Sequence, residues 1–188
     1  MARRHDEAER IAFASRAEWR QWLERHHDSS PGVFVVYGKK AARLPGPAYE
    51  DLIEEALCFG WIDGTLRPVD EQRTSLYFCP RRPGGMWAAS NKARVERLRA
   101  AGHMTPAGEA VIARAVEDGS WTILDRSEAL ELPDELAEAL AARPGSAAAF
   151  DALSPSLRKQ LIYQVDSAKR PDTRQRRAAA IADGLREP

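Results

Sequence analysis

Hydrophobic residues recur at helical spacing in the first clear element of the chain. Residues 15–18 read Ser-Arg-Ala-Glu, a capping box whose serine and glutamate satisfy amides at a helix start, and an apolar stripe with Trp19 and Leu23 follows. The run Val-Phe-Val-Val-Tyr at 33–37 is rich in β-branched and aromatic residues and follows a Pro-Gly break. The pattern therefore predicts a helix and then a buried strand.

A second helix and two further strands are predicted next. Residues 49–58 have acids in the first turn and apolar residues toward the end, and Gly60 is expected to end this helix in the left-handed conformation. Residues 61–67 and 74–79 both have strand composition and are joined by a charged turn. We therefore expect an α+β portion over residues 1–125, with about three strands, mostly antiparallel.

Strand patterns end near residue 90, and the rest of the chain has helical periodicity. Apolar stripes and cap residues predict helices over 90–101, from 105 onward, and over 133–142, 146–153, 154–169 and 171–185. We expect residues 126–188 to form a helical C-terminal module. The predicted fold class is α+β, a small mostly antiparallel sheet with flanking helices and this module.

Composition narrows the functional classes. Among 188 residues, 28 Lys and Arg balance 28 Asp and Glu, so no overall field draws the protein to nucleic acid or to a membrane. No apolar run approaches the ~20 residues of a membrane-spanning helix. Asp6, Glu7 and Glu9 interrupt the start of the chain where a signal peptide is apolar, and Cys58 and Cys79 form no disulfide framework. We expect a soluble, cytoplasmic protein.

The segment Trp61-Ile-Asp-Gly64 carries the first candidate site. An aspartate beside a tryptophan near a sheet end can accept a ligand hydrogen bond or act as a general base in a pocket. Asp-Gly is also a common turn dipeptide, whose aspartate binds its own backbone, and we favour this structural interpretation. Asp63 is nevertheless the one candidate catalytic residue.

Residues 78–83 read Phe-Cys-Pro-Arg-Arg-Pro, so Arg81 and Arg82 leave a strand between two prolines that restrict the backbone. Stiffly held guanidinium groups suit a carboxylate or a phosphate, but internal ion pairs are an equally supported alternative. The carboxylates considered as internal partners are Asp63, Glu50 and Glu54.

Other residues are expected beside this arginine pair. Lys39 and Lys40 end another strand, and we expect them at the same sheet end. Trp87 would form a flat wall there, although a core tryptophan before a helix is the simpler interpretation. The candidate ligand-binding residues are Trp61, Asp63, Arg81, Arg82 and Trp87.

The strongest charge asymmetry lies between residues 158 and 177, with seven basic residues and two acids. This cluster could contact nucleic acid, anionic lipid or an acidic partner. Alternatively, it faces residues 128–138, which carry five acids and no base, and the near-equal blocks favour this neutralisation. We do not expect this cluster to bind nucleic acid, since Tyr163 is the only aromatic residue between residues 158 and 177 on which a base could stack. The candidate basic patch is Lys169, Arg170, Arg174 and Arg177.

Known catalytic and cofactor motifs are missing from the sequence. The four histidines lack metal-ligand spacing, so we expect no metal, and no cofactor motif such as GxGxxG or a Walker loop occurs. Cys58 would lie in the last turn of a helix, where the dipole raises a thiol pKa and opposes nucleophilic reactivity. We therefore expect a binding protein in preference to an enzyme.

Several separated blocks together make a more specific pattern than any one of them. They are Cys58-Phe-Gly-Trp-Ile-Asp-Gly64, Phe78-Cys-Pro-Arg-Arg-Pro83, Trp87, Asn91, Arg94-Val-Glu-Arg97, Met104-Thr-Pro-Ala-Gly108 and Ser167-Ala-Lys-Arg-Pro-Asp-Thr-Arg174. In order and spacing, from about residue 15 to residue 183, the chain resembles the YdeI/OmpD-associated family, with residues 132–185 similar to its helical module. The resemblance implies a bacterial protein with a role in bacteriocin protection, meaning antimicrobial peptide resistance, and an association with an outer-membrane porin. It supplies no reaction, cofactor or catalytic residue.

Three functional hypotheses follow. The leading one is a non-enzymatic stress-tolerance protein that binds a small anionic ligand, or an acidic segment of a partner protein, at the arginine- and tryptophan-lined sheet end. The first alternative is an enzyme with Asp63 as general base and the arginines holding an anionic substrate. The second alternative gives the C-terminal arginines a contact with nucleic acid or anionic lipid.

Overall fold

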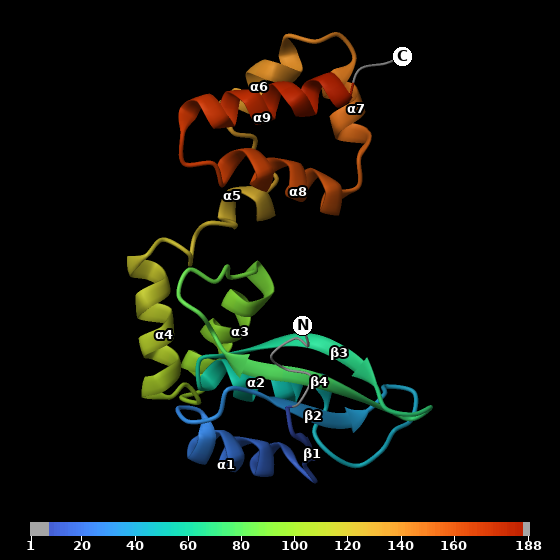
Figure 1. Ribbon diagram of the computed structural model, residues 1–188, viewed down its shortest axis with the longest axis vertical. Coiled ribbons are helices and arrows are strands. Elements are labelled where there is room, and N and C mark those ends of the chain that lie inside the picture. The colour runs from blue at the N-terminus through green and yellow to red at the C-terminus, as the bar shows by residue number, and fades with distance from the viewer. Residues whose placement is uncertain (1–7, 186–188) are drawn as a thin grey trace. The chain divides into compact units, whose positions relative to one another are not determined.

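The computed structural model describes residues 8–185 (Figure 1). Asp6 and Glu7, on which part of the export prediction rests, lie outside these residues. None of the helices within residues 8–185 combines the length and the apolarity needed to cross a membrane. The chain divides into two compact units: the first holds the residues up to Gly85 with Ser90–Gly119, and the second holds Met86–Ala89 and the residues from Ser120 onward.

The first unit is built on a four-stranded sheet in the order β1-β2-β4-β3. β1 runs parallel to β2, whereas β2 and β3 both run antiparallel to β4. The α+β fold class is thus confirmed, and the sheet is mixed, with one strand more than expected. The strands are β1 (Arg10–Ala12), β2 (Val33–Gly38), β3 (Trp61–Pro68) and β4 (Arg73–Pro80).

The register of β2 and β4 separates two groups of cations. Gly38, at the end of β2, is paired with Arg73, at the start of β4. Because the two strands are antiparallel, the residues that follow them lie at opposite ends of the sheet. The expectation that Lys39 and Lys40 gather with Arg81 and its neighbour is therefore wrong.

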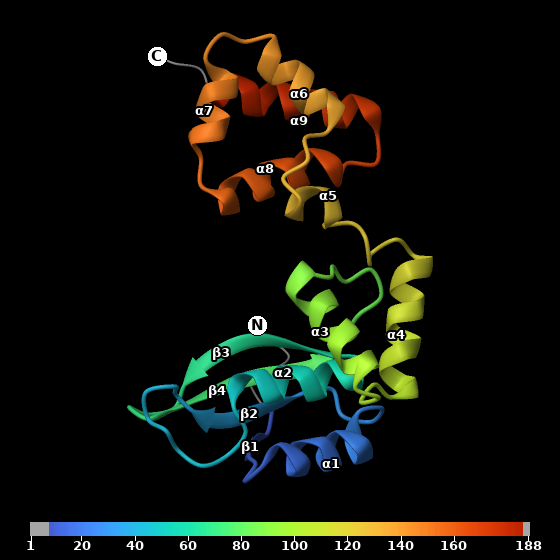
Figure 2. The ribbon, with the colours of Figure 1, turned by 180° about the vertical axis from the view of Figure 1, so that it is seen from behind.

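Helices α1 and α2 lie against one face of this sheet (Figures 1 and 2). The Ser15 cap is confirmed, since the Glu18 amide donates to the Ser15 hydroxyl at 3.2 Å. The Glu18 carboxylate accepts from the Ala14 amide at 2.9 Å and not from Ser15, so the second half of the predicted capping box is not formed. Trp19 joins three elements: its ring lies 5.3 Å from that of Phe78 on β4, and its Nε1 donates to the Leu52 carbonyl of α2. The helices are α1 (Arg16–His26), α2 (Tyr49–Cys58), α3 (Ala89–Ala100) and α4 (Pro106–Glu117).

The second unit, in the part of the chain that the structure describes, is entirely helical. Its core is a cluster of apolar side chains that includes Leu136, Phe150, Ile162 and Ile181. α8 begins as the sequence predicts, with the Ser154 hydroxyl accepting from an amide of the first turn and a proline at the helix start. The helices are α5 (Asp125–Glu128), α6 (Asp134–Ala141), α7 (Ser146–Ala152), α8 (Pro155–Asp166) and α9 (Pro171–Gly184).

Candidate functional site

A hollow of about 710 Å³ lies where β3 begins and β4 ends. Its volume is within the range of small-molecule binding sites. Its walls come from the end of α1, the turn between α2 and β3, the end of β4 and one side of α4. We call it the Arg81 pocket, and its lining is His27, Asp28, Phe59, Gly60, Trp61, Pro80, Arg81, Ala107, Ala110, Val111, Ala113 and Arg114.

The turn at Gly60 brings two candidate residues together. Gly60 has φ +73°, the left-handed conformation predicted for it, and a Cβ there would lie 2.5 Å from the Val111 side chain of α4. The Gly60 carbonyl accepts a hydrogen bond from the Arg81 amide at 3.0 Å. The backbone therefore places Trp61, the first residue of β3, beside Arg81.

The wall formed by α4 approaches the end of α2 closely. The Thr105 hydroxyl caps α4 and also donates to the Cys58 carbonyl at 2.6 Å. Gly108 permits this approach, since a Cβ there would lie 2.8 Å from the Cys58 carbonyl carbon. The pocket wall then consists of small side chains, among them Ala107 and Ala110, which leave room for a ligand.

Arg81 is the buried cation of this pocket, with 6% of its surface exposed. Burial lowers the pKa of Arg81 to about 10, and the negative charge of nearby Asp63 opposes the lowering. Because this pKa is well above 7, the guanidinium stays charged at neutral pH. A charge in a site of low dielectric attracts an anion more strongly than the same charge in water.

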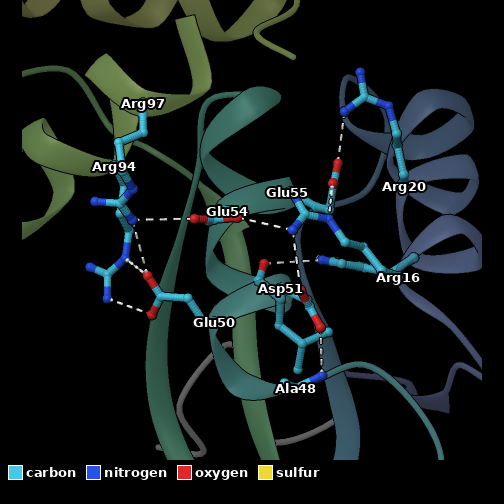
Figure 3. Close-up of polar contacts among 11 residues, drawn as sticks. Arg16, Arg20, Ala48, Glu50, Asp51, Glu54, Glu55, Arg94 and Arg97 are labelled. Atoms are coloured by element: carbon cyan, nitrogen blue, oxygen red, sulfur yellow. Dashed lines mark hydrogen bonds and ion pairs between the residues drawn. The ribbon is translucent and has the colours of Figure 1, made fainter. Parts of the chain in front are cut away.

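Two of the carboxylates considered as internal partners of the arginine pair belong to another network (Figure 3). Glu50 accepts from Arg94 through two bonds of 2.7 and 2.9 Å, which hold the pKa of Glu50 below its ordinary value. Glu54 pairs with Arg16 at 2.9 Å and with Arg97 at 3.3 Å. These acids are thus engaged by α1 and α3.

Further charged groups stand at the rim of the Arg81 pocket. Arg114 is exposed on α4 and makes no ion pair with residues 8–185. Asp28 also lines the pocket, so a ligand could place an anionic group between the two arginines and a polar or cationic group at Asp28. His27 is held by its Nδ1, 2.9 Å from the Leu23 carbonyl.

The prolines on either side of the arginine pair leave its two members in different surroundings. Arg81 is buried, whereas Arg82 is exposed. Both line a second, neighbouring hollow of about 350 Å³, together with Tyr77 and Cys79 of β4. Arg81 thus lies between the two hollows, and Arg82 belongs to the smaller one.

The two candidate tryptophans differ in position. Trp61 lines the Arg81 pocket but is 1% exposed, and its Nε1 donates to the His27 carbonyl at 3.0 Å. It therefore supplies a fixed apolar wall and no spare donor. Trp87 belongs to the second unit, where its ring lies 4.9 Å from that of Trp121.

Asp63 lies two residues further along β3 than Trp61 and is paired with Phe78. It is not among the residues that line the Arg81 pocket, and its carboxylate makes no hydrogen bond with residues 8–185. Its charge acts on two tyrosines, since burial and then Asp63 raise the pKa of Tyr49, and burial, Tyr49 and Asp63 raise that of Tyr37. The charge of Asp63 thus acts on these phenols as well as on Arg81, although Asp63 lies outside the lining of the Arg81 pocket.

Burial raises the thiol pKa of both cysteines, which opposes nucleophilic reactivity. Cys58 is fully buried, and burial, with the charge of Glu55 adding to it, raises the pKa of its thiol to about 11. The direction agrees with the prediction, but burial is the largest cause. Within residues 8–185, no three His, Cys, Asp or Glu side chains are arranged to hold a metal ion.

The basic cluster of the second unit is partly neutralised inside the unit. Lys159 donates to Glu128 at 2.5 Å, and Arg174 lies 3.5 Å from Glu135, so the predicted pairing with the acidic segment is confirmed for these residues. Arg177 donates to a backbone carbonyl of α8 at 2.6 Å. The exposed members that make no ion pair within residues 8–185 are Lys169, Arg170 and Arg176.

Two family models match the chain, one in each unit. A domain of unknown function, DUF8412, matches residues 11–111, and a model described as bacteriocin-protection, YdeI or OmpD-associated matches residues 129–187. The chain belongs to the DUF8412 family, whose model covers more than half of it, and its C-terminal part is similar to the YdeI/OmpD-associated family. The predicted resemblance is thus confirmed for the C-terminal part. Comparisons with the curated proteins and with the solved structures found no match.

Proposed function

We propose that this protein is a non-enzymatic, cytoplasmic stress-tolerance protein of the bacteriocin-protection type. In this proposal the Arg81 pocket binds a small ligand that carries a carboxylate, or a carboxylate side chain of a partner protein. The YdeI/OmpD-associated domain supports the broad role through the name of its family. The ligand class comes from the pocket alone.

The observation that carries the proposal is that a buried and an exposed arginine line the same hollow. Arg81 lies at the sheet end, Arg114 lies on α4, and both line the pocket. A carboxylate between them would accept charge-assisted hydrogen bonds from both sides, which are stronger than bonds between neutral groups. The apolar wall of alanines and Trp61 would cover the rest of the ligand.

The enzyme hypothesis has less support. It needs Asp63 as a general base close to the substrate that the arginines hold. Asp63 does not line the Arg81 pocket. We therefore expect Asp63→Asn to leave ligand binding unchanged; consumption of a bound probe that stops in this variant would instead establish the enzyme.

Thermal unfolding with added probes tests the proposed binding. Citrate, glutamate and a short glutamate-rich peptide should raise the Tm, since a ligand that binds only the folded chain stabilises it. Arg81→Ala removes a buried group and can unfold the protein, so Arg114→Glu on the exposed rim is the better variant. Arg114→Glu should abolish the increase in Tm that the probes cause.

Arg176→Glu is the matched control, because it makes the same charge change at an exposed residue of α9. This variant should keep the full increase in Tm. Absence of an increase at low ionic strength for all three probes, or an equal increase in Arg114→Glu, would contradict the binding proposal. Survival of bacteria exposed to a bacteriocin, with the wild type or Arg114→Glu expressed, tests the role in protection, and only the wild type should protect.

A further inference from the structure

A second cationic pocket lies at the opposite end of the sheet from Arg81. It has a volume of about 440 Å³ and is formed by the end of β2, the loop that follows it and the start of α2. It shares no residue with the Arg81 pocket, so ligand binding there does not depend on the proposed function. We call it the lysine-tyrosine pocket and define it by Tyr37, Lys39, Lys40, Arg43, Tyr49 and Glu50.

Its three cations are not neutralised by carboxylates of the described residues. The Lys39 ammonium donates to the backbone carbonyl of Asp70 at 2.9 Å, which leaves its charge uncompensated. Lys40 and Arg43 make no ion pair with residues 8–185. By contrast, Arg16 and Arg94 of the same unit are held by acids.

The one acid that lines this pocket is already occupied. The Glu50 carboxylate accepts hydrogen bonds from Nε and Nη2 of Arg94, at 2.7 and 2.9 Å. The pair as a whole is neutral, so among the residues that line the pocket only the three cations carry an uncompensated charge. Arg43 is also held with φ +47°, a left-handed conformation that is uncommon for a residue with a side chain.

Two phenols complete the site. The rings of Tyr37 and Tyr49 lie 6.3 Å apart at an angle of 39°, and neither hydroxyl makes a hydrogen bond with residues 8–185. Burial raises the pKa of both, so they remain protonated donors at neutral pH. Asp63 lies near the phenols, and its charge would repel an anion from that side of the pocket.

The two sides of the pocket therefore suit two parts of one ligand. The cations suit a phosphate group, and the rings suit an uncharged planar body. A cavity of 440 Å³ is of small-molecule size and far exceeds a bare phosphate. We propose that the lysine-tyrosine pocket binds a small organic phosphate, with the phosphate at Lys40 and Arg43 and the planar body against Tyr37 and Tyr49.

Calorimetric titration at low ionic strength tests this proposal with three probes: adenosine 5′-monophosphate, adenosine and inorganic phosphate. The nucleotide should bind at least about tenfold more tightly than either part alone, because only it uses both sides of the pocket. The double variant Lys40→Glu, Arg43→Glu should weaken nucleotide binding by at least about tenfold. Both residues are exposed, so the variant should fold, which circular dichroism checks.

Two controls separate this site from the others. Arg176→Glu changes a charge in the second unit, and Arg114→Glu changes the Arg81 pocket; both should bind the nucleotide as the wild type does. Tyr49→Phe should weaken binding less than the charge reversals. No measurable nucleotide binding, binding no tighter than that of inorganic phosphate, or unchanged affinity in the double variant would each overturn the proposal.

Discussion

Arg94 of α3 grips Glu50 of α2 with two nearly parallel hydrogen bonds, from Nε to Oε1 at 2.7 Å and from Nη2 to Oε2 at 2.9 Å (Figure 3). The same guanidinium donates to Asn91 within α3 at 3.0 Å. A bidentate pair fixes orientation as well as distance. This relationship attaches α3 to the first turn of α2 and removes Glu50 from the anions available to other cations.

The pair predicts how stability depends on pH. The pKa of Glu50 is lower in the folded chain than its ordinary value of 4.5, mainly through the Arg94 hydrogen bonds, and Arg99 lowers the pKa of Glu109 likewise. As the pH falls, the unfolded chain therefore binds protons before the folded chain does. The Glu50–Arg94 pair stabilises the folded chain fully at pH values well above 4.5, and this stabilisation is lost as the pH falls through the lowered pKa of Glu50. Urea unfolding between about pH 6 and about pH 3 should show this loss.

Arg94→Gln supplies the comparison for this experiment. Without the guanidinium, the pKa of Glu50 should return toward its ordinary value, so stability should fall less steeply with acid than in the wild type. Identical slopes for the two proteins would mean that this pair does not shape the acid response.

Glu55 is the buried member of the helix network and should matter most for stability. It is 3% exposed and accepts from Arg16 at 2.6 Å and from Arg20 at 2.8 Å. Glu55→Ala should cost about 2 kcal/mol of unfolding free energy, below the usual cost for a buried pair because both arginines are partly solvated. Chemical denaturation measures this value. Glu24→Ala, at an exposed acid that also pairs with Arg20, should cost less than about 0.5 kcal/mol.

Gly108 should resist substitution although it lies in a helix. Alanine is favoured over glycine there by about 1 kcal/mol of helix propensity. A Cβ would, however, lie 2.8 Å from the Cys58 carbonyl carbon. The backbone of α2 cannot move aside as a side chain can, so α4 would have to shift, at a cost of about 1–3 kcal/mol of unfolding free energy. We expect Gly108→Ala to lower the Tm and Gly184→Ala, which has open space around it, to leave it unchanged or raise it. A Gly108→Ala protein more stable than the wild type, by the full helix-propensity gain of about 1 kcal/mol, would refute the close packing of α4 on α2.

Cys58 should be almost unreactive in the folded protein. It is fully buried, and its thiol has a pKa of about 11, so the thiolate that attacks alkylating reagents is scarce at pH about 8. Iodoacetamide labelling followed by peptide mass spectrometry should show slow labelling at Cys58 that becomes fast in urea. Rapid labelling of Cys58 in the folded protein would show that this thiol is accessible and more acidic.

Much of the fold could be predicted because local signals agree with the packing. The caps at Ser15, Thr105 and Ser154 mark helix starts where the structure has them. β1 was missed because three residues, Arg-Ile-Ala, carry no period of their own, and only their parallel pairing with β2 makes them a strand. α5 is a single turn and likewise gives no periodic pattern.

The candidate site could be predicted only in part. Trp61 and Arg81 do line one pocket, because the ends of two adjacent antiparallel strands meet. Another wall comes from α4. Arg114 was missed because the local sequence pattern predicts a helix there but not which distant elements that helix packs against. The signal that could have suggested it is the run of small residues at Ala107, Gly108 and Ala110, which lets another element come close.

The binding proposal is tested most directly by locating an acidic ligand on the protein. Nitrogen-edited NMR spectra recorded during titration with the glutamate-rich peptide report each backbone amide and each indole N–H. If the peptide binds in the Arg81 pocket, signals should shift at Gly60, at Arg81, at the alanines of α4 and at the Trp61 indole, and the largest changes should be lost in Arg114→Glu. Shifts confined to α9, or no shifts at any residue, would contradict it.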